Sequence, residues 1–467
     1  MTTLIPKFQR TGTTTNRPIN EKLSEIVNIL DFGFSGVAGA DIYASLTAAI
    51  ASGAKLINIP AGQFTLSATI TLTGAIRIDG AGGLRSIGEI VSGTKLGVTE
   101  ITYTGSSTAI SMESGNGNGW QNQHLSNFIL LGTSAAVTGI YAGNPTGTGW
   151  LTFSSLTNIS VSGFVGTGGD SAGIRIGRCL ETKFTGVSSF DNKYGFSLNA
   201  GGQITTLVFD TCIANGCTIG WVIKSAVSCT WLNCIGEGCK EYGFYIVSEA
   251  VNNTASLDFY NCYTESNGTD GADKNFLITA DTYANRPQFI NFNGGYYAPA
   301  NNVGNVQAFT CDFASNIIWD NVYLPVNTAG TITASSNTIS CKYISTVAGK
   351  YYTDVTNNVP YYGVAFESGS TAPARWISAS LTTAQTDTLP FKRGVITIQA
   401  VSPSTVGRSA VFGINAASTE LISGNATFWA NTATAGKASV YYSGANVIIQ
   451  NDLVGEVLFV IVDALCI

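Results

Sequence analysis

A degenerate repeat between Leu125 and about Leu324 limits the possible folds of this chain more than any other feature. Each copy opens with an apolar residue, a variable residue, usually Asn, and a second apolar residue. The eight copies are Leu125-Ser126-Asn127-Phe128, Leu156-Thr157-Asn158-Ile159, Phe184-Thr185-Gly186-Val187, Phe209-Asp210-Thr211-Cys212, Trp231-Leu232-Asn233-Cys234, Phe259-Tyr260-Asn261-Cys262, Phe289-Ile290-Asn291-Phe292 and Trp319-Asp320-Asn321-Val322. Successive copies start 22 to 31 residues apart, and a period of ~20–50 residues is typical of repeat architectures.

Each copy of the repeat predicts short strands and no helix. Runs such as Thr206-Leu207-Val208-Phe209 alternate in polarity, which indicates half-buried strands. A second landmark, usually Gly before an apolar residue as in Gly139-Ile140, suits a turn with positive φ before another strand. Units of this kind bury their apolar residues by stacking, so we expect a right-handed parallel β-helix.

Stacking the copies in register predicts two columns. The Asn column suits a bend, because Asn tolerates the left-handed conformation and its amide can bond to the neighbouring coil. Its members are Asn127, Asn158, Asn233, Asn261, Asn291 and Asn321. The next column should point into the core, and it contains Phe128, Ile159, Val187, Cys212, Cys234, Cys262, Phe292 and Val322.

Composition narrows the class of protein. Only 11% of the 467 residues are charged, well below the ~25% that is usual, and so uncharged a surface favours a homo-oligomer. The net charge of −6, without a basic stripe, argues against nucleic acid. No apolar run of about 18 residues is present, so we expect no membrane insertion. The first residues lack the pattern of a signal peptide, which predicts assembly in a cytosol with reduced thiols.

The ten Cys residues allow two interpretations. One stacked column contains Cys212, Cys234 and Cys262, and another contains Cys217 and Cys239. The first interpretation is therefore a metal site or disulfide bonds. The other is buried Cys acting as a small apolar residue. We favour the second, because there is no CxxC and His124 is the one His available to complete a mixed site. We therefore expect neither a metal nor an organic cofactor.

The predicted organisation has four parts. Residues 1–30 form a head with a helix over Asn20–Ile29; 31–350 form the β-helix, with an entry and capping region at 31–85 and coils at 86–350; 351–373 form a linker; 374–467 form an antiparallel β-sandwich. An amphipathic helix over Asp41–Ala51 should cover the end of the solenoid. Entry strands are expected at Lys55–Ile59, Gln63–Leu66, Thr69–Leu72 and Ala75–Ile78, and sandwich strands at Val395–Ala400, Ser409–Ile414, Ala426–Ala430, Ser439–Tyr442, Val447–Gln450 and Val454–Val462.

The entry region resembles a known family. Its residues are Asn16-Arg17-Pro18-Ile19-Asn20-Glu21-Lys22-Leu23-Ser24-Glu25, Asp31-Phe32-Gly33, Asp41, Ala48-Ala49-Ile50, Ile57-Asn58-Ile59-Pro60-Ala61-Gly62-Gln63-Phe64 and Ile78-Asp79-Gly80-Ala81-Gly82. Over about residues 1–85 they are similar to the opening of bacteriophage tailspikes with a pectate-lyase-like β-helix. The paired Asp usual near position 41 is single here.

The resemblance implies a homotrimeric protein of the virion tail that acts at the bacterial cell surface after assembly in the host cytoplasm. In such proteins the head binds the phage tail or an adaptor protein. The β-helix binds a bacterial surface polysaccharide, either capsule or O-antigen. The C-terminal domain holds the trimer together or adds binding. Many relatives cleave the glycan, some deacetylate it and some only bind it. The positions of the catalytic residues vary within the family, so the resemblance supplies none.

The repeat register identifies a first pair of candidate catalytic residues. A glycoside hydrolase needs one protonated and one ionised carboxyl group. Counting six residues past each repeat start places Glu237 and Glu265 on adjacent coils, with Cα atoms ~4.8 Å apart. Like charges at this distance would raise one pKa and supply an acid and a base. The alternative is a solvated turn column in which two Glu coincide by chance.

A second pair is Asp210 and Asp258, both expected outward on one strand face and separated by two coils. That places them ~10 Å or a little more apart, near the inverting range. Tyr260 and Tyr263 lie nearby and could stack on sugar faces, although outward Tyr in a sheet also reflects plain β-propensity. Asp191, Asp281, Asp312 and Asp320 stay open as further candidates, as does a site between subunits.

The sequence supports reactions other than hydrolysis less well. A polysaccharide lyase would need a cationic or Tyr base, and Arg175, Arg178, Lys183 and Lys193 cluster loosely in one coil, a pattern that more often marks a solvated face. The sequence reveals no partner side chain for His124, so we interpret it as a surface residue of its strand. The leading hypothesis is hydrolysis of a bacterial surface polysaccharide by Glu237 and Glu265. A lyase and a non-catalytic receptor-binding fibre are the alternatives; a bacterial adhesin or secreted pectinase is disfavoured.

Overall fold

The computed structural model divides the chain into two compact units, residues 1–310 and 311–467. The first unit is described over residues 7–8, 17–18, 25–82, 97–113, 122–143, 149–168, 170–199, 202–248, 253–268, 276–282, 285–297 and 309–310. The second is described at residues 311, 314–323, 332–334, 342–347, 353–354, 373–377, 385–389, 394–401, 408–415, 418–424, 429–435, 437–443, 446–452 and 459–465. Most of the predicted head lies outside these residues.

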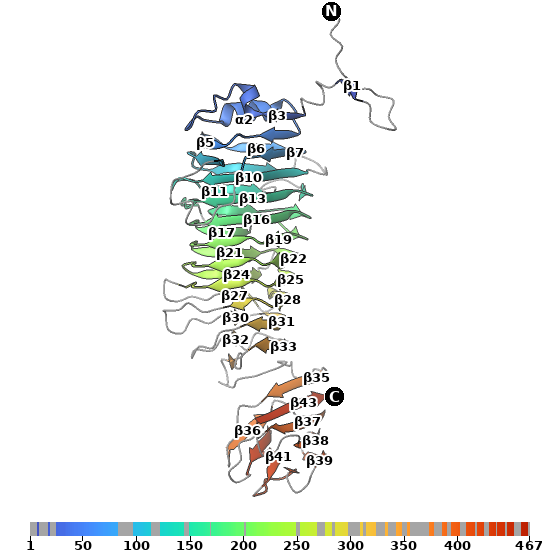
Figure 1. The fold of residues 1–467 in the computed structure, drawn as a ribbon. Coiled ribbons are helices and arrows are strands. Elements are labelled where there is room, and N and C mark those ends of the chain that lie inside the picture. Colours follow the sequence, from blue (N-terminus) through green and yellow to red (C-terminus); the bar gives the residue numbers. More distant parts are fainter. Residues whose placement is uncertain are drawn as a thin grey trace, which may run out of the picture. The chain divides into compact units, whose positions relative to one another are not determined.

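The first unit is a right-handed parallel β-helix, as the repeat predicts, and Figure 1 shows its strands stacked in chain order. Each coil has three walls. Long strands run along wall 1, bend at the Asn column and continue into wall 2. A separate strand then forms wall 3. Because each strand bonds to its equivalents in the coils before and after it, every ladder is parallel.

Walls 1 and 2 belong to one continuous hydrogen-bonded sheet. Within the first unit its strands are β3 (Ile26–Asn28), β4 (Leu56–Asn58), β5 (Gly62–Leu66), β7 (Ile76–Asp79), β8 (Thr99–Tyr103), β10 (Gln123–Leu131), β12 (Leu151–Thr152), β13 (Ser155–Ser162), β15 (Cys179–Leu180), β16 (Lys183–Phe190), β18 (Ile204–Thr205), β19 (Val208–Asp210), β20 (Ile213–Asn215), β22 (Ala226–Leu232), β23 (Ile235–Glu237), β25 (Ala255–Tyr260), β26 (Tyr263–Glu265), β28 (Gln288–Asn293) and β29 (Tyr296–Tyr297). Strand β10 shows the bend: its first half pairs with β7 on wall 1 and its second half with β8 on wall 2.

Wall 3 is a second parallel sheet. Within the first unit its strands are β6 (Ile70–Thr73), β9 (Thr108–Glu113), β11 (Thr138–Ala142), β14 (Ala172–Ile176), β17 (Tyr194–Leu198), β21 (Ile219–Lys224), β24 (Tyr242–Ser248) and β27 (Phe276–Ala280). The Gly landmarks begin these strands and do not have positive φ, so that part of the prediction is wrong. A Cβ on Gly139 would lie 2.5 Å from the carbonyl oxygen of Gly173, so Gly there permits close packing of neighbouring coils.

The core is a stack of aromatic rings from opposite walls. On wall 1, Phe209, Trp231, Phe259 and Phe292 stack with centroids 4.6–5.2 Å apart. On wall 3, Phe196, Trp221, Phe244 and Phe276 stack in the same way. The two ladders meet edge to face, as between Trp221 and Trp231. Stacked and edge-to-face pairs are both favourable arrangements of the aromatic quadrupole.

The bends between walls 1 and 2 confirm most of the Asn column. Asn127, Asn158, Asn233 and Asn261 all have φ of 49–62°. The Asn158 amide donates to the Asn127 side-chain oxygen at 3.3 Å, which is the bonding between coils that the column predicts. Asn291 does not belong to this column: Tyr260 pairs with Asn293, so Gly294, with φ of 66°, follows Asn261. The side chain of Asn321 lies outside the described residues.

The entry region covers the N-terminal end of the β-helix. Helix α2 (Tyr43–Ala51) confirms the predicted capping helix, with Leu46 and Ala49 buried. The four entry strands appear as β4, β5, β6 and β7. The helix expected over Asn20–Ile29 is wrong where it is described, because β3 and the 3₁₀ helix η1 (Ile29–Phe32) occupy residues 26–32. Residues 26–28 pair with β4 instead, so tertiary pairing overrides a local helical pattern.

The second unit begins with parallel strands and continues with mainly antiparallel sheets. The parallel pairs are β31 (Ser315–Tyr323) with β33 (Lys342–Val347), and β32 (Ile332–Ala334) with β34 (Thr353–Asp354). One sheet has the order β35 (Pro373–Ile377), β43 (Phe459–Leu465), β37 (Gly394–Val401), β38 (Arg408–Asn415), β39 (Ser418–Gly424). The other has β36 (Gln385–Leu389), β42 (Asn446–Asn451), β41 (Ala438–Ser443), β40 (Trp429–Ala430), with β40 parallel to β41. Of the remaining strands, β30 (Phe309–Cys311) ends at the unit boundary, and β1 (Lys7–Phe8) and β2 (Arg17–Pro18) form a hairpin.

Candidate active site

Glu237 and Glu265 lie side by side on the outer face of wall 2. They are direct register partners on β23 and β26, as the repeat register predicts. Each follows a buried residue, Gly236 or Thr264, and is itself half-buried, so both side chains face outward. Adjacent parallel strands are ~4.8 Å apart. The fold therefore brings two carboxylates together on one accessible surface.

Two stacked Tyr rings lie on the Glu265 side of this pair. Tyr263 is the register partner of Tyr296, and their rings stack with centroids 5.3 Å apart and an interplanar angle of 14°. The Tyr263 hydroxyl donates a hydrogen bond to Oε2 of Glu265. Burial, this hydrogen bond and the charges of Glu265 and Glu237 all raise the pKa of Tyr263. The phenol therefore keeps its proton at neutral pH and serves as a donor to the Glu265 carboxylate.

A tight turn follows each of these strands and fixes where the acidic side chains emerge. Gly238 and Ser266, the residues after Glu237 and Glu265, both have positive φ, of 62° and 57°. The Gly238 amide donates to the Glu265 carbonyl oxygen at 3.0 Å, so the two turns are bonded to each other. Gly or a small polar residue suits this backbone conformation.

Asp210 and Asp258 share the outer face of wall 1 but are not close neighbours. Asp210 aligns with Leu232 and Tyr260, whereas Asp258 aligns with Thr230. Two strands and two residues along the strand separate them, which puts their Cα atoms about 12 Å apart. Asp210 forms an ion pair with Lys183 at 3.4 Å, and Asp258 accepts from the Asn291 amide at 2.7 Å. Each carboxylate thus has a different partner.

Tyr260 and its surroundings complete wall 1. Its side chain is 40% exposed on the outer face, as expected of a residue that could stack on a sugar. The pairing of Asn291 with Asp258 does not follow from the repeat pattern, which puts Phe289 in the column of Phe259. The structure pairs Phe259 with Phe292, a shift of three residues. The adjacent Gly294 and Gly295, both with positive φ, are the signal that locates the turn.

The remaining acidic candidates are dispersed. Asp191 is exposed at a turn with φ of 52°, and Asp281 accepts from the Asn285 amide at 3.0 Å. Asp312 and the side chain of Asp320 lie outside the described residues. None of the described candidates lies in the column of Glu237 and Glu265.

The four cations considered for a lyase do not converge. Arg175 lies on wall 3, where it forms an ion pair with Asp170 at 2.9 Å. Lys183 lies on wall 1. The Arg178 guanidinium carbon lies 6.0 Å from the centroid of the Trp150 ring, and the Lys193 Nζ lies 5.5 Å from the centroid of the Tyr194 ring. The coil therefore presents these charges on different walls, each beside a partner of its own.

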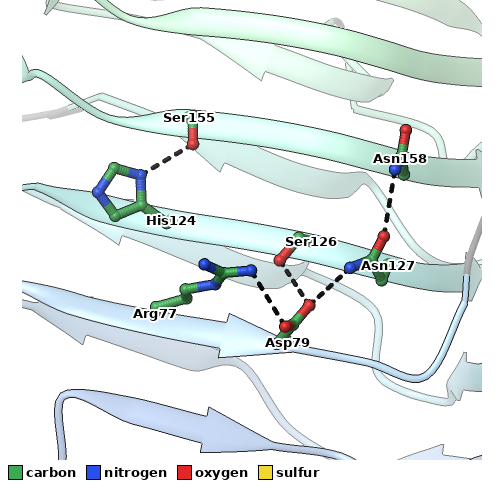
Figure 2. A network of polar contacts seen from close by, with 7 residues as sticks. All are labelled: Arg77, Asp79, His124, Ser126, Asn127, Ser155 and Asn158. Carbon is green, nitrogen blue, oxygen red and sulfur yellow. Dashed lines mark hydrogen bonds and ion pairs between the residues drawn. The ribbon is translucent and has the colours of Figure 1, made fainter.

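His124 has partners that the sequence did not reveal, so its assignment as a residue without one is wrong. Its Nδ1 lies 2.8 Å from the Ser155 hydroxyl of the next coil, a contact drawn in Figure 2. Arg77, its register partner on the other side, forms an ion pair with Asp79. Burial and the Arg77 charge both lower the pKa of His124. Asp79 also accepts from Ser126 and Asn127, which connects this network to the Asn column.

The Cys columns are part of the core. All eight described Cys residues are buried, as the apolar interpretation predicts. Cys212 and Cys234 donate to the carbonyl oxygens of Phe184 and Phe209 in the preceding coil. Burial raises the pKa of Cys217 to about 12, so its thiol stays protonated. Within the described residues, no group of three or more His, Cys, Asp or Glu is arranged to hold a metal ion.

Comparison with known proteins gives likeness of fold alone. No protein family model matches the chain, and neither does any curated protein. Among solved structures, the tailspike of Escherichia coli bacteriophage HK620 in complex with a pentasaccharide is 11% identical with a TM-score of 0.47, covering 98% of this chain and 97% of that one. The tailspike gp49 of Acinetobacter baumannii bacteriophage Fri1, a capsular polysaccharide depolymerase, is 12% identical with a TM-score of 0.41, covering 98% and 89%.

A third solved structure of this kind is the A-module of the mannuronan C-5 epimerase AlgE4 from Azotobacter vinelandii. It is 18% identical with a TM-score of 0.46, covering 68% of this chain and 76% of that one. Tailspikes and carbohydrate-active enzymes thus recur among the similar structures. None of the described helices has the length and apolar character needed to span a membrane.

Proposed function

We propose that this chain is a phage tailspike that binds a bacterial capsule or O-antigen polysaccharide and cleaves it by glycoside hydrolysis. One observation carries the proposal: Glu237 and Glu265 are register partners on an outer face, beside the stacked rings of Tyr263 and Tyr296. Paired carboxylates supply the acid and the base of this reaction, and aromatic rings supply a platform for a sugar.

The hydrogen bond from Tyr263 supports a division of roles between the two carboxyl groups. In this proposal Glu265, which accepts that hydrogen bond as a carboxylate, is the nucleophile, and Glu237 is the general acid. Glu237 gives its proton to the glycosidic oxygen as the bond from that oxygen to C1 breaks, and Glu265 bonds to C1. Glu237 then takes a proton from water while the water oxygen attacks C1 and releases Glu265. The balance is one water consumed for each bond cleaved.

This pair and the Asp pair predict different stereochemistry. The Cα atoms of register partners on adjacent strands are ~4.8 Å apart, a spacing compatible with the ~5–5.5 Å carboxyl separation of retaining enzymes. The Cα atoms of Asp210 and Asp258 are about 12 Å apart, which is closer to the ~6.5–9.5 Å carboxyl separation of inverting enzymes than to that of retaining ones, so this pair would invert the configuration at C1. The anomer first released, observed by proton NMR, therefore discriminates between the two candidate pairs.

The test is mass spectrometry of products after incubating the protein with a panel of capsular and O-antigen polysaccharides. Hydrolysis gives fragments heavier by one water per cut. Glu237→Gln and Glu265→Gln should then lower kcat about 10²–10⁴-fold while glycan binding persists. Glu181→Gln, at an exposed turn position outside both candidate pairs, is the matched control. Unchanged cleavage by both Gln variants would contradict the site. Unsaturated fragments would indicate a lyase, and binding without cleavage a receptor-binding fibre.

A further inference from the structure

Phe289 is an aromatic residue that the fold exposes where the repeat pattern would bury it. The three-residue shift in β28 gives its core position to Phe292, which stacks on Phe259. The Phe289 side chain is 53% exposed, and its backbone has φ of 56°. A bulky side chain in the left-handed region is a genuine outlier.

The same turn recurs in earlier coils and shows what such a position normally holds. The register aligns Phe289 with Phe153, Glu181, Thr206, Ser228 and Ser256, all with φ of 50–55°. Its nearest neighbours in this column are small and polar, so the turn itself does not require an aromatic ring. A strained residue persists where the surrounding structure holds it, and such residues concentrate at ligand-binding sites.

The neighbours of Phe289 on wall 1 match the chemistry of a sugar. Two residues along the strand, the Asn291 amide donates to Asp258 at 2.7 Å. Tyr260, 40% exposed, follows Asp258 by two residues and aligns with Asn293. A carboxylate–amide pair can bond to hydroxyl groups, and an aromatic face can pack on the C–H face of a pyranose ring.

We propose that Phe289, Tyr260, Asp258 and Asn291 form a subsite that binds one pyranose unit of the polysaccharide, with Phe289 as the stacking residue. This rests on the proposed function, since the same glycan would reach the Glu pair across the bend at Asn261. Phe289 is here a positioning residue: it holds the chain on wall 1 while cleavage occurs on wall 2.

The test uses Phe289→Asn, because Asn tolerates the left-handed backbone conformation of this position. The matched control is Phe153→Asn, in the same turn column, 38% exposed and five strands or ~24 Å away. Both variants should keep or raise Tm, by ~1–3 °C. Binding is measured on an array of bacterial capsular and O-antigen polysaccharides, in a Glu237→Gln background that prevents cleavage.

The expected result is about tenfold weaker binding by Phe289→Asn, with Phe153→Asn unchanged. In the cleaving protein, Phe289→Asn should raise KM more than it lowers kcat. Wild-type affinity in Phe289→Asn would overturn the subsite and leave the proposed function standing, as would an equal loss in both variants. A change in the mass of Phe289→Asn in solution would assign the ring to a contact between copies and overturn the subsite too. Binding to no glycan by the parent protein would overturn both proposals.

Discussion

Single residues set the corners of this β-helix. Asn127 and Asn158 adopt positive φ, and their amides connect successive coils, starting from Asp79. Asn fits because its short polar side chain tolerates the left-handed region and bonds locally. The positive φ expected from the spacing of Gly139 and its equivalents is absent. Gly occupies these positions because two backbones approach each other closely there. The type of residue predicts a special position here, and the packing decides which one.

His124 should make stability depend on pH, since it is the one His of the chain. Its folded pKa lies below the ordinary value of 6.5, so the unfolded state binds the proton first. The contribution is fully present above pH 6.5 and is lost as the pH falls below that value. We expect the free energy of unfolding, measured in urea between pH 5 and 8, to fall less on acidification in His124→Gln. An equal pH dependence in both proteins would contradict this.

Tyr263→Phe should show whether the Tyr263 hydroxyl acts by positioning the Glu265 carboxylate or by binding the glycan. The variant keeps the ring that stacks on Tyr296 but removes the hydroxyl that donates to Glu265. We expect kcat to fall about tenfold or more, since a charge-assisted hydrogen bond contributes ~1.5–3 kcal/mol, with KM nearly unchanged. Steady-state kinetics on a cleaved polysaccharide checks this. Tyr194→Phe, the same substitution on wall 3, should leave kcat unchanged. A rise in KM alone for Tyr263→Phe would refute the proposed role.

At the scale of the element, each strand is stabilised mainly by its equivalents in neighbouring coils. The aromatic ladder shows this: Phe259 stacks on Trp231 on one side and on Phe292 on the other. Strand β28 shows the limit of pattern reading. Phe289-Ile290-Asn291-Phe292 fits the repeat, yet the structure uses Phe292 as the core residue, because Gly294 and Gly295 must form the next turn. Two registers fit the local pattern, and contacts with β25 select one.

Phe259→Ala should cost about 3–5 kcal/mol of unfolding free energy, because it leaves a cavity between two fixed rings. The neighbouring Tyr260→Ala, on the outer face, should cost no more than about 0.5 kcal/mol. Denaturant unfolding monitored by Trp fluorescence measures both. Similar losses in the two variants would contradict the assignment of inner and outer faces.

At the scale of the whole molecule, the assembly stays a prediction. The resemblance implies a homotrimer, and only 11% of the residues are charged, which favours association. We expect light scattering to give a mass about three times the 48.8 kDa of the chain. A mass of one chain at micromolar concentration would rule out the trimer.

The sequence by itself determined the architecture, the bends at Asn, the buried Cys and the pairing of Glu237 with Glu265. It could do so because stacked coils repeat one environment, so residues at equal offsets become neighbours. Tertiary structure alone decided the register of β28, the partners of Asp258 and His124, and the exposure of Phe289. The register of β28 depends on which of two locally similar alignments the neighbouring coils accept, and the partner of Asp258 and the exposure of Phe289 follow from it. The partners of His124 come from adjacent coils, so they too require those coils to be in place.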